Sequence, residues 1–123
     1  MRARILVVDD DRDNADSLAR LVGILGYEAV TAYSGQEAIA AAQDVCPEMV
    51  FIDLAMPGMD GCETAKRLRE LLGNQTVLVA VTGWSRQEDR RRSADCGFDL
   101  HYAKPLSLPA LEELLAIPAA HST

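Results

Sequence analysis

The chain has 123 residues, 49% of them hydrophobic, and a net charge of −7. This length fits one domain with a substantial core, and the acidic balance argues against a general nucleic-acid or anionic-membrane surface, which would need a basic patch. No apolar stretch approaches the ~18–20 residues of a membrane-spanning helix, and a strand-like run begins too early to leave room for a signal peptide.

The three cysteines Cys46, Cys62 and Cys96 are scattered and form no CxxC pair. An odd, dispersed set of this kind is typical of reduced thiols in a cytoplasmic protein and does not indicate a disulfide framework. We therefore expect free thiols and a cytoplasmic location.

Strand-like runs alternate with helix-like segments five times, a pattern that predicts an α/β fold with a parallel sheet. The runs at 5–8, 49–52 and 77–81 are continuously apolar, as expected for strands covered on both faces, whereas 28–32 and 100–103 are mixed and suit edge strands. Three central and two edge strands fit the order 2-1-3-4-5.

The helix-like segments carry start and stop signals. Ser34 and Ser85 each precede a Glu by three residues, as in a capping box, while Asp60 and Ser107 are further candidate N-caps. Gly26 is expected to end the first helix and Pro118 the last, followed by a frayed tail at 119–123.

The fourth predicted helix, from Ser85 to Cys96, has almost no apolar stripe. Such a helix gains little from core packing, so we expect it to be the loosest of the fold. Its run Arg90-Arg91-Arg92 is read as a solvated face rather than a docking site.

Polar residues follow four of the predicted strands, and in a parallel sheet they would meet at one edge, where open α/β sheets bind ligands. Three carboxylates there would repel one another unless a cation intervened, and hard oxygen ligands suit Mg²⁺ or Mn²⁺. The Asp9-Asp10-Asp11 run alone would be a solvated loop and helix cap, a role that still fits Asp11 and Asp13. The strand-end residues are Asp9, Asp10, Asp53, Thr82, Gly83 and Lys104.

Asp53 becomes a candidate nucleophile if a cation and Lys104 lie nearby, because carboxylates form acyl phosphates when the incoming charge is neutralised. The Lys104 ammonium supplies a point charge, the Thr82 hydroxyl can donate to a phosphoryl oxygen, and Gly83 allows close backbone approach.

From about residue 3 to 116, the chain resembles the receiver domains of two-component response regulators. The resemblance rests on four motifs in order: VVDDD at 7–11, IDLAMPGMDG at 52–61, VTGW at 81–84 and AKP at 103–105. It implies the flavodoxin-like (CheY-like) doubly wound (βα)5 fold. The stretch from TGW to GFD is especially similar to receivers of hybrid histidine kinases.

The resemblance also implies roles. Asp53 would accept a phosphoryl group from the phosphohistidine of a sensor kinase or phosphotransfer protein. Asp10, Asp53 and the backbone oxygen of Ala55 would bind Mg²⁺, with Asp9 acting through water. The phosphoryl oxygens would be held by Thr82 and Lys104, helped by backbone N–H groups near Leu54, Ala55 and Gly83. The peptide bond between Lys104 and Pro105 is expected to be cis.

Two departures from the family pattern stand out. His101 occupies the position of an aromatic switch residue that is usually Tyr or Phe, so we hypothesise that His101 couples to Thr82 with pH sensitivity near neutrality. The resemblance implies that the positions of Ala55 and Trp84 set water access to the acyl phosphate and hence its lifetime. Ala55 would favour access and Trp84 would oppose it. A partner-facing role for Trp84 carries nearly equal weight.

The leading interpretation is a phosphoacceptor module that switches a protein-binding surface on the fourth helix, fifth strand and fifth helix, as a monomer or weak dimer. It is either a stand-alone regulator or a receiver excised from a membrane-anchored hybrid kinase, and we expect no output domain. A haloacid-dehalogenase-type phosphatase would need an Asp at position 55, and a flavodoxin would need a phosphate-cradling loop instead of Asp9-Asp10-Asp11.

Overall fold

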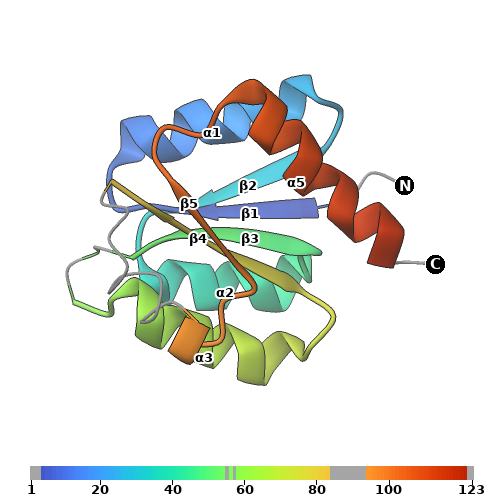
Figure 1. The fold of residues 1–123 in the computed structure, drawn as a ribbon. Coiled ribbons are helices and arrows are strands. Elements are labelled where there is room, and N and C mark those ends of the chain that lie inside the picture. The colour runs from blue at the N-terminus through green and yellow to red at the C-terminus, as the bar shows by residue number, and fades with distance from the viewer. Residues whose placement is uncertain (1–3, 55, 57, 84–93, 122–123) are drawn as a thin grey trace.

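The computed structural model describes residues 4–54, 56, 58–83 and 94–121. Its centre is a parallel five-stranded sheet in the order β2-β1-β3-β4-β5, with helices on both faces (Figure 1). The fold class and strand order predicted from the sequence are therefore confirmed. The strands are β1 (Arg4–Val8), β2 (Glu28–Ala32), β3 (Met49–Asp53), β4 (Val77–Thr82) and β5 (Leu100–Ala103).

The sheet divides the core into two layers. Helices α1 and α5 cover one face of the sheet, and α2 and α3 cover the other (Figure 1). Alternate strand residues point to opposite faces and feed two buried clusters, one containing Leu6 and Ile52 and the other Val7 and Phe51. The predicted helix at 85–96 falls largely outside the described residues. Within the described part of the chain, the helices are α1 (Arg12–Ile24), α2 (Gly35–Val45), α3 (Gly61–Leu72) and α5 (Leu108–His121).

Side-chain caps begin these helices where the sequence predicted them. Ser34 accepts a hydrogen bond from the Glu37 N–H, and Asp60 accepts one of 2.9 Å from the Glu63 N–H. Asp11 caps α1, which confirms its reading as a cap rather than as a site residue. Each cap satisfies a backbone donor that the first helical turn leaves without a partner.

Two expectations from the sequence are wrong. Helix α5 continues past Pro118 to His121, because a proline removes only one helical hydrogen bond and few residues follow it here. Cys62 and Cys96 form a disulfide, although the sequence predicted free thiols. The fold brings these distant positions to a Cα–Cα distance of 5.2 Å, which lies in the range that disulfides use. Cys46 is free and exposed.

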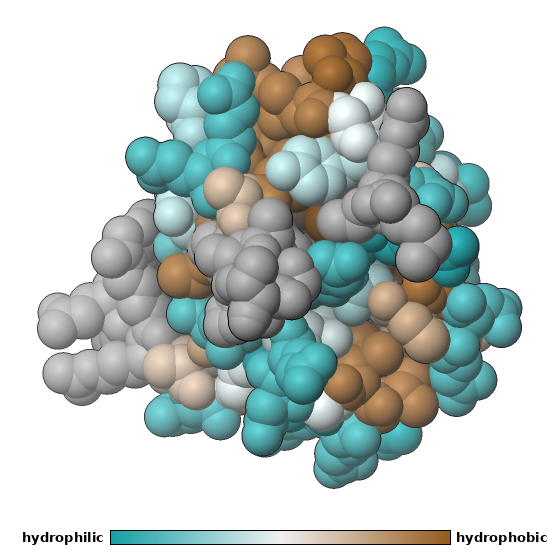
Figure 2. Space-filling view, turned by 90° about the vertical axis from the view of Figure 1, so that its right-hand side faces the viewer, coloured by the Kyte–Doolittle hydropathy of each residue, from teal (hydrophilic) through white to brown (hydrophobic). Residues whose placement is uncertain are grey.

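The face that bears both chain termini lies opposite the carboxyl ends of the strands and is mostly hydrophilic, with hydrophobic residues in separate groups (Figure 2). Among the described residues, the exposed large hydrophobic side chains are Ile24, Leu71 and Leu108, from three different parts of the chain. None of the described helices is long and apolar enough to cross a membrane.

Candidate functional site

The polar residues predicted at the strand ends lie together at one edge of the sheet. Asp9 follows β1, Asp53 ends β3, Thr82 ends β4 and Lys104 follows β5. Asp9, Asp53 and Thr82 are all buried, with 5%, 8% and 3% of their surface exposed. Buried polar groups are costly unless they interact, so this gathering indicates a functional site rather than a solvated rim.

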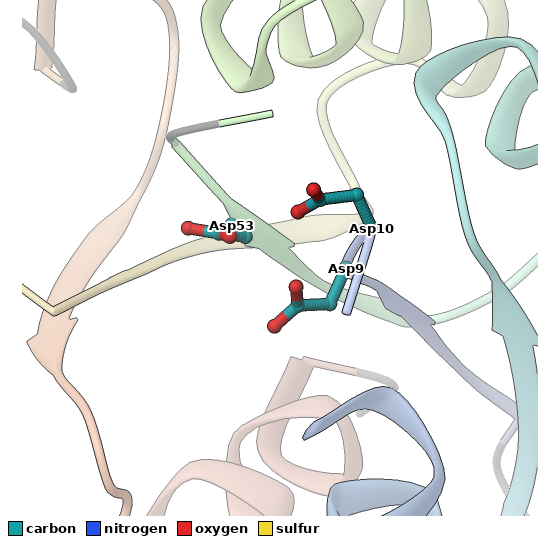
Figure 3. Close-up of side chains that lie close together, drawn as sticks. All are labelled: Asp9, Asp10 and Asp53. Carbon is teal, nitrogen blue, oxygen red and sulfur yellow. The ribbon is translucent and has the colours of Figure 1, made fainter. Parts of the chain in front are cut away.

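Three carboxylates form the acidic part of the site (Figure 3). One oxygen from each of Asp9, Asp10 and Asp53 can be chosen so that all three lie within 4.8 Å of one another. Asp9 and Asp53 are buried and Asp10 is exposed, so the cluster opens to solvent on one side. An all-oxygen donor set with room for water fits a hard divalent cation such as Mg²⁺.

Lys104 supplies the positive charge of the site. Its Nζ lies 2.7 Å from Oδ2 of Asp9 and 3.4 Å from Oδ2 of Asp53. Partial burial works to lower the pKa of Lys104, but the hydrogen bond to Asp9 and the charges of Asp53 and Asp9 outweigh it, and the pKa is raised above 10.5. The ammonium is therefore fully charged near neutral pH.

Backbone hydrogen bonds hold these side chains in place. The Lys104 N–H donates to the Thr82 carbonyl at 2.8 Å, which extends the β4–β5 pairing beyond the last strand residue. The Asp9 N–H donates to the carbonyl of Ala32 at 3.1 Å, and Asp9 Oδ1 accepts the N–H of Asp11. The ammonium and the hydroxyl are thus mounted on neighbouring, rigidly paired chain segments.

Helix α3 starts directly against the end of β3, which carries Asp53. A Cβ added to Gly61 would lie 2.5 Å from the Asp53 carbonyl oxygen and 2.7 Å from Cα of Leu54, distances that no side chain tolerates. The Gly61 N–H also donates to the Leu54 carbonyl at 3.3 Å. The sequence indicated this glycine only as the last residue of the 52–61 motif, because the close contact arises from how α3 packs.

His101 lies on β5 opposite Ala80, and β4 places Thr82 two residues beyond Ala80 on the same face of the sheet. His101 is half-buried there. The strand register therefore places His101 diagonally from Thr82, and the coupling between the two residues stays a prediction. The Lys104-Pro105 bond is cis, as the resemblance implied.

The remaining site predictions are only partly covered by the structure. Leu54 is half-buried and Gly83 is exposed, both next to a strand end of the site. Ala55 and Trp84 lie outside the described residues, so the structure adds nothing to their expected roles.

A cavity of about 170 Å³ adjoins the buried carboxylates between α1 and the segment after β5. Its lining includes the charged side chains of Asp9, Asp53 and Lys104 and the apolar side chains of Leu18 and Leu21. The sequence did not predict this hollow, because it depends on the spacing between α1 and the chain around Pro105.

Comparisons with known proteins agree with this geometry. The family model described as the response regulator receiver domain matches residues 5–116. The chain is 37% identical over 115 residues to the sensor histidine kinase RcsC of Salmonella typhi. The matched region covers 94% of this chain and 12% of RcsC. It is 38% identical over 116 residues to the response regulator MprA of Mycolicibacterium vanbaalenii, covering 94% and 48% of the two chains.

Solved structures give the same answer. The chemotaxis protein CheY4 of Vibrio cholerae superposes with a TM-score of 0.88 and 27% identity, over 95% of this chain and 98% of CheY4. A CheY-like response regulator receiver domain protein from Methanospirillum hungatei superposes with a TM-score of 0.89 and 26% identity, over 99% of this chain and 98% of that protein. The chain thus spans less than half of the two curated relatives but nearly all of each solved neighbour. It belongs to the family of response regulator receiver domains of two-component signal transduction.

Proposed function

We propose that the chain is an Mg²⁺-dependent phosphoacceptor whose Asp53 takes a phosphoryl group from the phosphohistidine of a sensor histidine kinase or a histidine phosphotransfer protein. The observation that carries this proposal is the buried Asp53 carboxylate, which lies beside two further carboxylates and 3.4 Å from the Lys104 ammonium. The similarity to a sensor histidine kinase and to a response regulator supports the same class of donor.

The transfer needs one bond to form and one to break. An Asp53 carboxylate oxygen attacks phosphorus, and the phosphorus–nitrogen bond breaks with its electron pair leaving on the donor histidine. The Lys104 ammonium offsets the charge of the phosphoryl oxygens, and the Thr82 hydroxyl donates to one of them. Backbone N–H groups of Leu54, Ala55 and Gly83 hold the others.

The acidic cluster would hold the cation that this chemistry requires. Asp10, Asp53 and the backbone oxygen of Ala55 are the proposed direct ligands of Mg²⁺ or Mn²⁺, and Asp9 acts through water. A bound divalent cation supplies charge neutralisation for phosphoryl transfer. The protein performs only its own phosphorylation and dephosphorylation at Asp53, and is a signalling module rather than an enzyme with a separate substrate.

The phosphoryl group would add negative charge at Asp53, and this local change would alter a protein-binding surface elsewhere on the domain. The phosphoryl group engages Thr82, and His101 responds from the same face of the sheet, changing the surface built from the predicted fourth helix, β5 and α5. A downstream protein binds that surface in the cytoplasm, without nucleic acid or membrane contact, and the module acts as a monomer or weak dimer. Ala55 and Trp84 set the lifetime of the acyl phosphate, and Trp84→Ala should shorten it.

The test is intact-protein mass after treatment with acetyl phosphate and Mg²⁺. Wild type should gain a labile adduct of about 80 Da that is absent with EDTA and in Asp53→Asn. Asp44→Asn, an exposed change at the far end of α2, is the matched control and should be modified like wild type. A folded wild-type protein that gains no adduct from acetyl phosphate or from a phosphohistidine protein would refute the proposal.

A further inference from the structure

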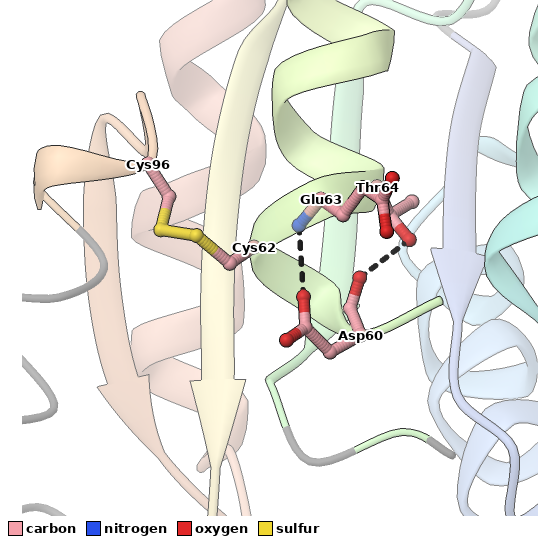
Figure 4. The surroundings of a disulfide bond; sticks show 5 residues. All are labelled: Asp60, Cys62, Glu63, Thr64 and Cys96. Carbon is pink, nitrogen blue, oxygen red and sulfur yellow. Dashed lines mark hydrogen bonds between the residues drawn. A yellow bond between two sulfur atoms is a disulfide. The ribbon is translucent and has the colours of Figure 1, made fainter. Parts of the chain in front are cut away.

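The disulfide between Cys62 and Cys96 is the most informative feature outside the phosphoryl site (Figure 4). It joins the first turn of α3 to the segment that leads into β5, across 34 residues of sequence. Cytoplasmic disulfides are uncommon, and those that occur are usually transient and catalytic or redox-sensing. Under the proposed function the receiver acts in the cytoplasm, so a pair at this position is a candidate for reversible chemistry.

We propose that Cys62 and Cys96 form a reversible thiol–disulfide pair whose oxidation slows phosphoryl uptake at Asp53. The pairing and its redox chemistry stand on the geometry around the two sulfurs, whereas the effect on uptake rests on the proposed function. Small-molecule or protein disulfides, such as the glutathione class, are the oxidants.

The two cysteines differ in access, which assigns their parts in the exchange. Cys62 is half-buried, whereas Cys96 is only 4% exposed and packs in the core cluster with Phe98. The Cys62 thiolate attacks an external disulfide, forms a mixed disulfide and releases one thiolate. Cys96 then attacks the Cys62 sulfur and releases the second, so the protein dithiol loses two electrons and two protons and the external disulfide becomes two thiols.

One side of the disulfide is connected to the proposed nucleophile. Asp60 caps α3, and its carbonyl accepts a 2.8 Å hydrogen bond from Thr64 (Figure 4). Gly61 packs on the backbone of Asp53. Cys62 is the next residue along this turn. A covalent restraint on Cys62 therefore acts on the helix end that contacts the strand carrying Asp53.

The other side is connected to the phosphoryl-binding hydroxyl. Cys96 lies shortly before β5, and β5 pairs with β4 with Ala103 opposite Thr82. Asp99 accepts a 2.8 Å hydrogen bond from the Leu78 N–H, and its own N–H donates to the Leu78 carbonyl at 2.8 Å. Oxidation therefore fixes to α3 the segment that leads into β5, the strand that pairs with β4 as far as Thr82. Any movement of Thr82 toward a phosphoryl group then meets more resistance.

Alkylation reads out the thiols directly. The full chain carrying Cys46→Ser keeps only the pair. After equilibration over a series of glutathione ratios it is trapped with N-ethylmaleimide in denaturant, so that the buried Cys96 thiol is also labelled, and its mass is measured. We expect a direct transition from two labels to none. Two labels at every glutathione ratio would overturn the reversible pair. The absence of any label even in a strong dithiol reductant would overturn it as well.

The functional arm compares initial phosphorylation rates with acetyl phosphate and Mg²⁺ in the oxidised and reduced Cys46→Ser protein. We expect the oxidised form to be slower by about threefold or more. The matched control Cys46→Ser/Cys62→Ser cannot form the bond and should show equal rates under both conditions. Equal rates in the pair-containing protein would overturn the coupling, whereas no phosphorylation in either state would refute the proposed function and leave the alkylation result standing.

Discussion

The ammonium of Lys104 donates a hydrogen bond of 2.7 Å to Oδ2 of Asp9, although the two residues are 95 positions apart in the chain. Asp9 is almost fully buried, so its charge is poorly solvated and depends on this partner. Lys104 is thus a structural counter-ion of the acidic cluster as well as a candidate phosphoryl ligand. Its single charge leaves the three carboxylates in excess, which favours a further cation.

Lys104 should give the protein a characteristic alkaline instability. Its pKa is raised above 10.5 in the folded state, so the folded protein holds the proton more tightly than the unfolded chain. This stabilisation is fully present below the unfolded pKa and is lost as pH rises through the folded pKa. Without Mg²⁺, the unfolding free energy of wild type should therefore approach that of Lys104→Met as pH rises from about 9 to 11.5 in urea titrations.

The control for this experiment is Lys66→Met, because Lys66 is the other lysine of the chain and is exposed on α3. Its stability should run parallel to wild type over the same pH range. A constant gap between wild type and Lys104→Met at every alkaline pH would contradict the raised pKa.

Neutralising Asp10 should stabilise the protein in the absence of metal. Asp10 is the exposed member of the three-carboxylate cluster, so Asp10→Asn removes repulsion without leaving a buried group behind. We expect a gain on the order of 1 kcal/mol in the unfolding free energy in EDTA. The stabilisation that Mg²⁺ gives wild type should be reduced or lost in the variant.

Urea unfolding with EDTA and with excess Mg²⁺ measures both effects. Asp44→Asn is the matched charge change outside the cluster, and it should keep the wild-type response to Mg²⁺. An Asp10→Asn protein that gains as much from Mg²⁺ as wild type would show that Asp10 is no ligand.

Periodicity and strand-end chemistry were sufficient to predict the sheet and most of the site. Continuous apolar runs separate central from edge strands, and parallel topology then brings Asp9, Asp53, Thr82 and Lys104 to one edge with no knowledge of packing. Capping residues such as Ser34 and Asp60 are local signals and were equally readable. These features depend on short-range rules or on topology alone.

What the sequence did not reveal depends on how the layers pack. Cys62 and Cys96 carry no spacing signal, and only the approach of α3 to the segment before β5 pairs them. The need for glycine at position 61 likewise comes from the contact of α3 with the Asp53 backbone. Pro118 was a readable stop signal, but the helix extends past it to His121.

Gly61→Ala should damage both stability and phosphorylation. Alanine normally favours a helix by about 0.5–1 kcal/mol over glycine, but here its Cβ would collide with the backbone at Asp53 and Leu54. Shifting either α3 or β3 to relieve this contact displaces the nucleophile. We expect a lower midpoint in thermal unfolding and slower adduct formation with acetyl phosphate.

Gly23→Ala is the matched control, because Gly23 lies in α1 and a Cβ there would meet nothing within 4 Å. This variant should be at least as stable as wild type and be phosphorylated at the same rate. Equal behaviour of the two variants would mean that α3 does not rest on the Asp53 strand as described.

Among the described residues, Arg69 should be the cation that contributes most to the integrity of the β4–β5 edge. From α3 its guanidinium donates to the carbonyls of Thr76 and Gly97 and forms a 2.8 Å ion pair with Asp99, with a fourth hydrogen bond to Gly73. Arg69→Met leaves these acceptors without their donor, so we expect a loss of about 2–3 kcal/mol in the free energy of unfolding.

Arg67 provides the comparison, since it lies on the same helix and pairs only with Glu63 among the described residues, at 3.3 Å and with both side chains more than half exposed. Exposed pairs of this kind contribute little, so Arg67→Met should change the unfolding free energy by less than about 0.5 kcal/mol. Because Arg69 and the disulfide both tie α3 to residues 96–99, the Arg69→Met loss should be larger in the reduced protein than in the oxidised one. Urea unfolding in both redox states measures this difference, and equal losses would show that the two connections act independently.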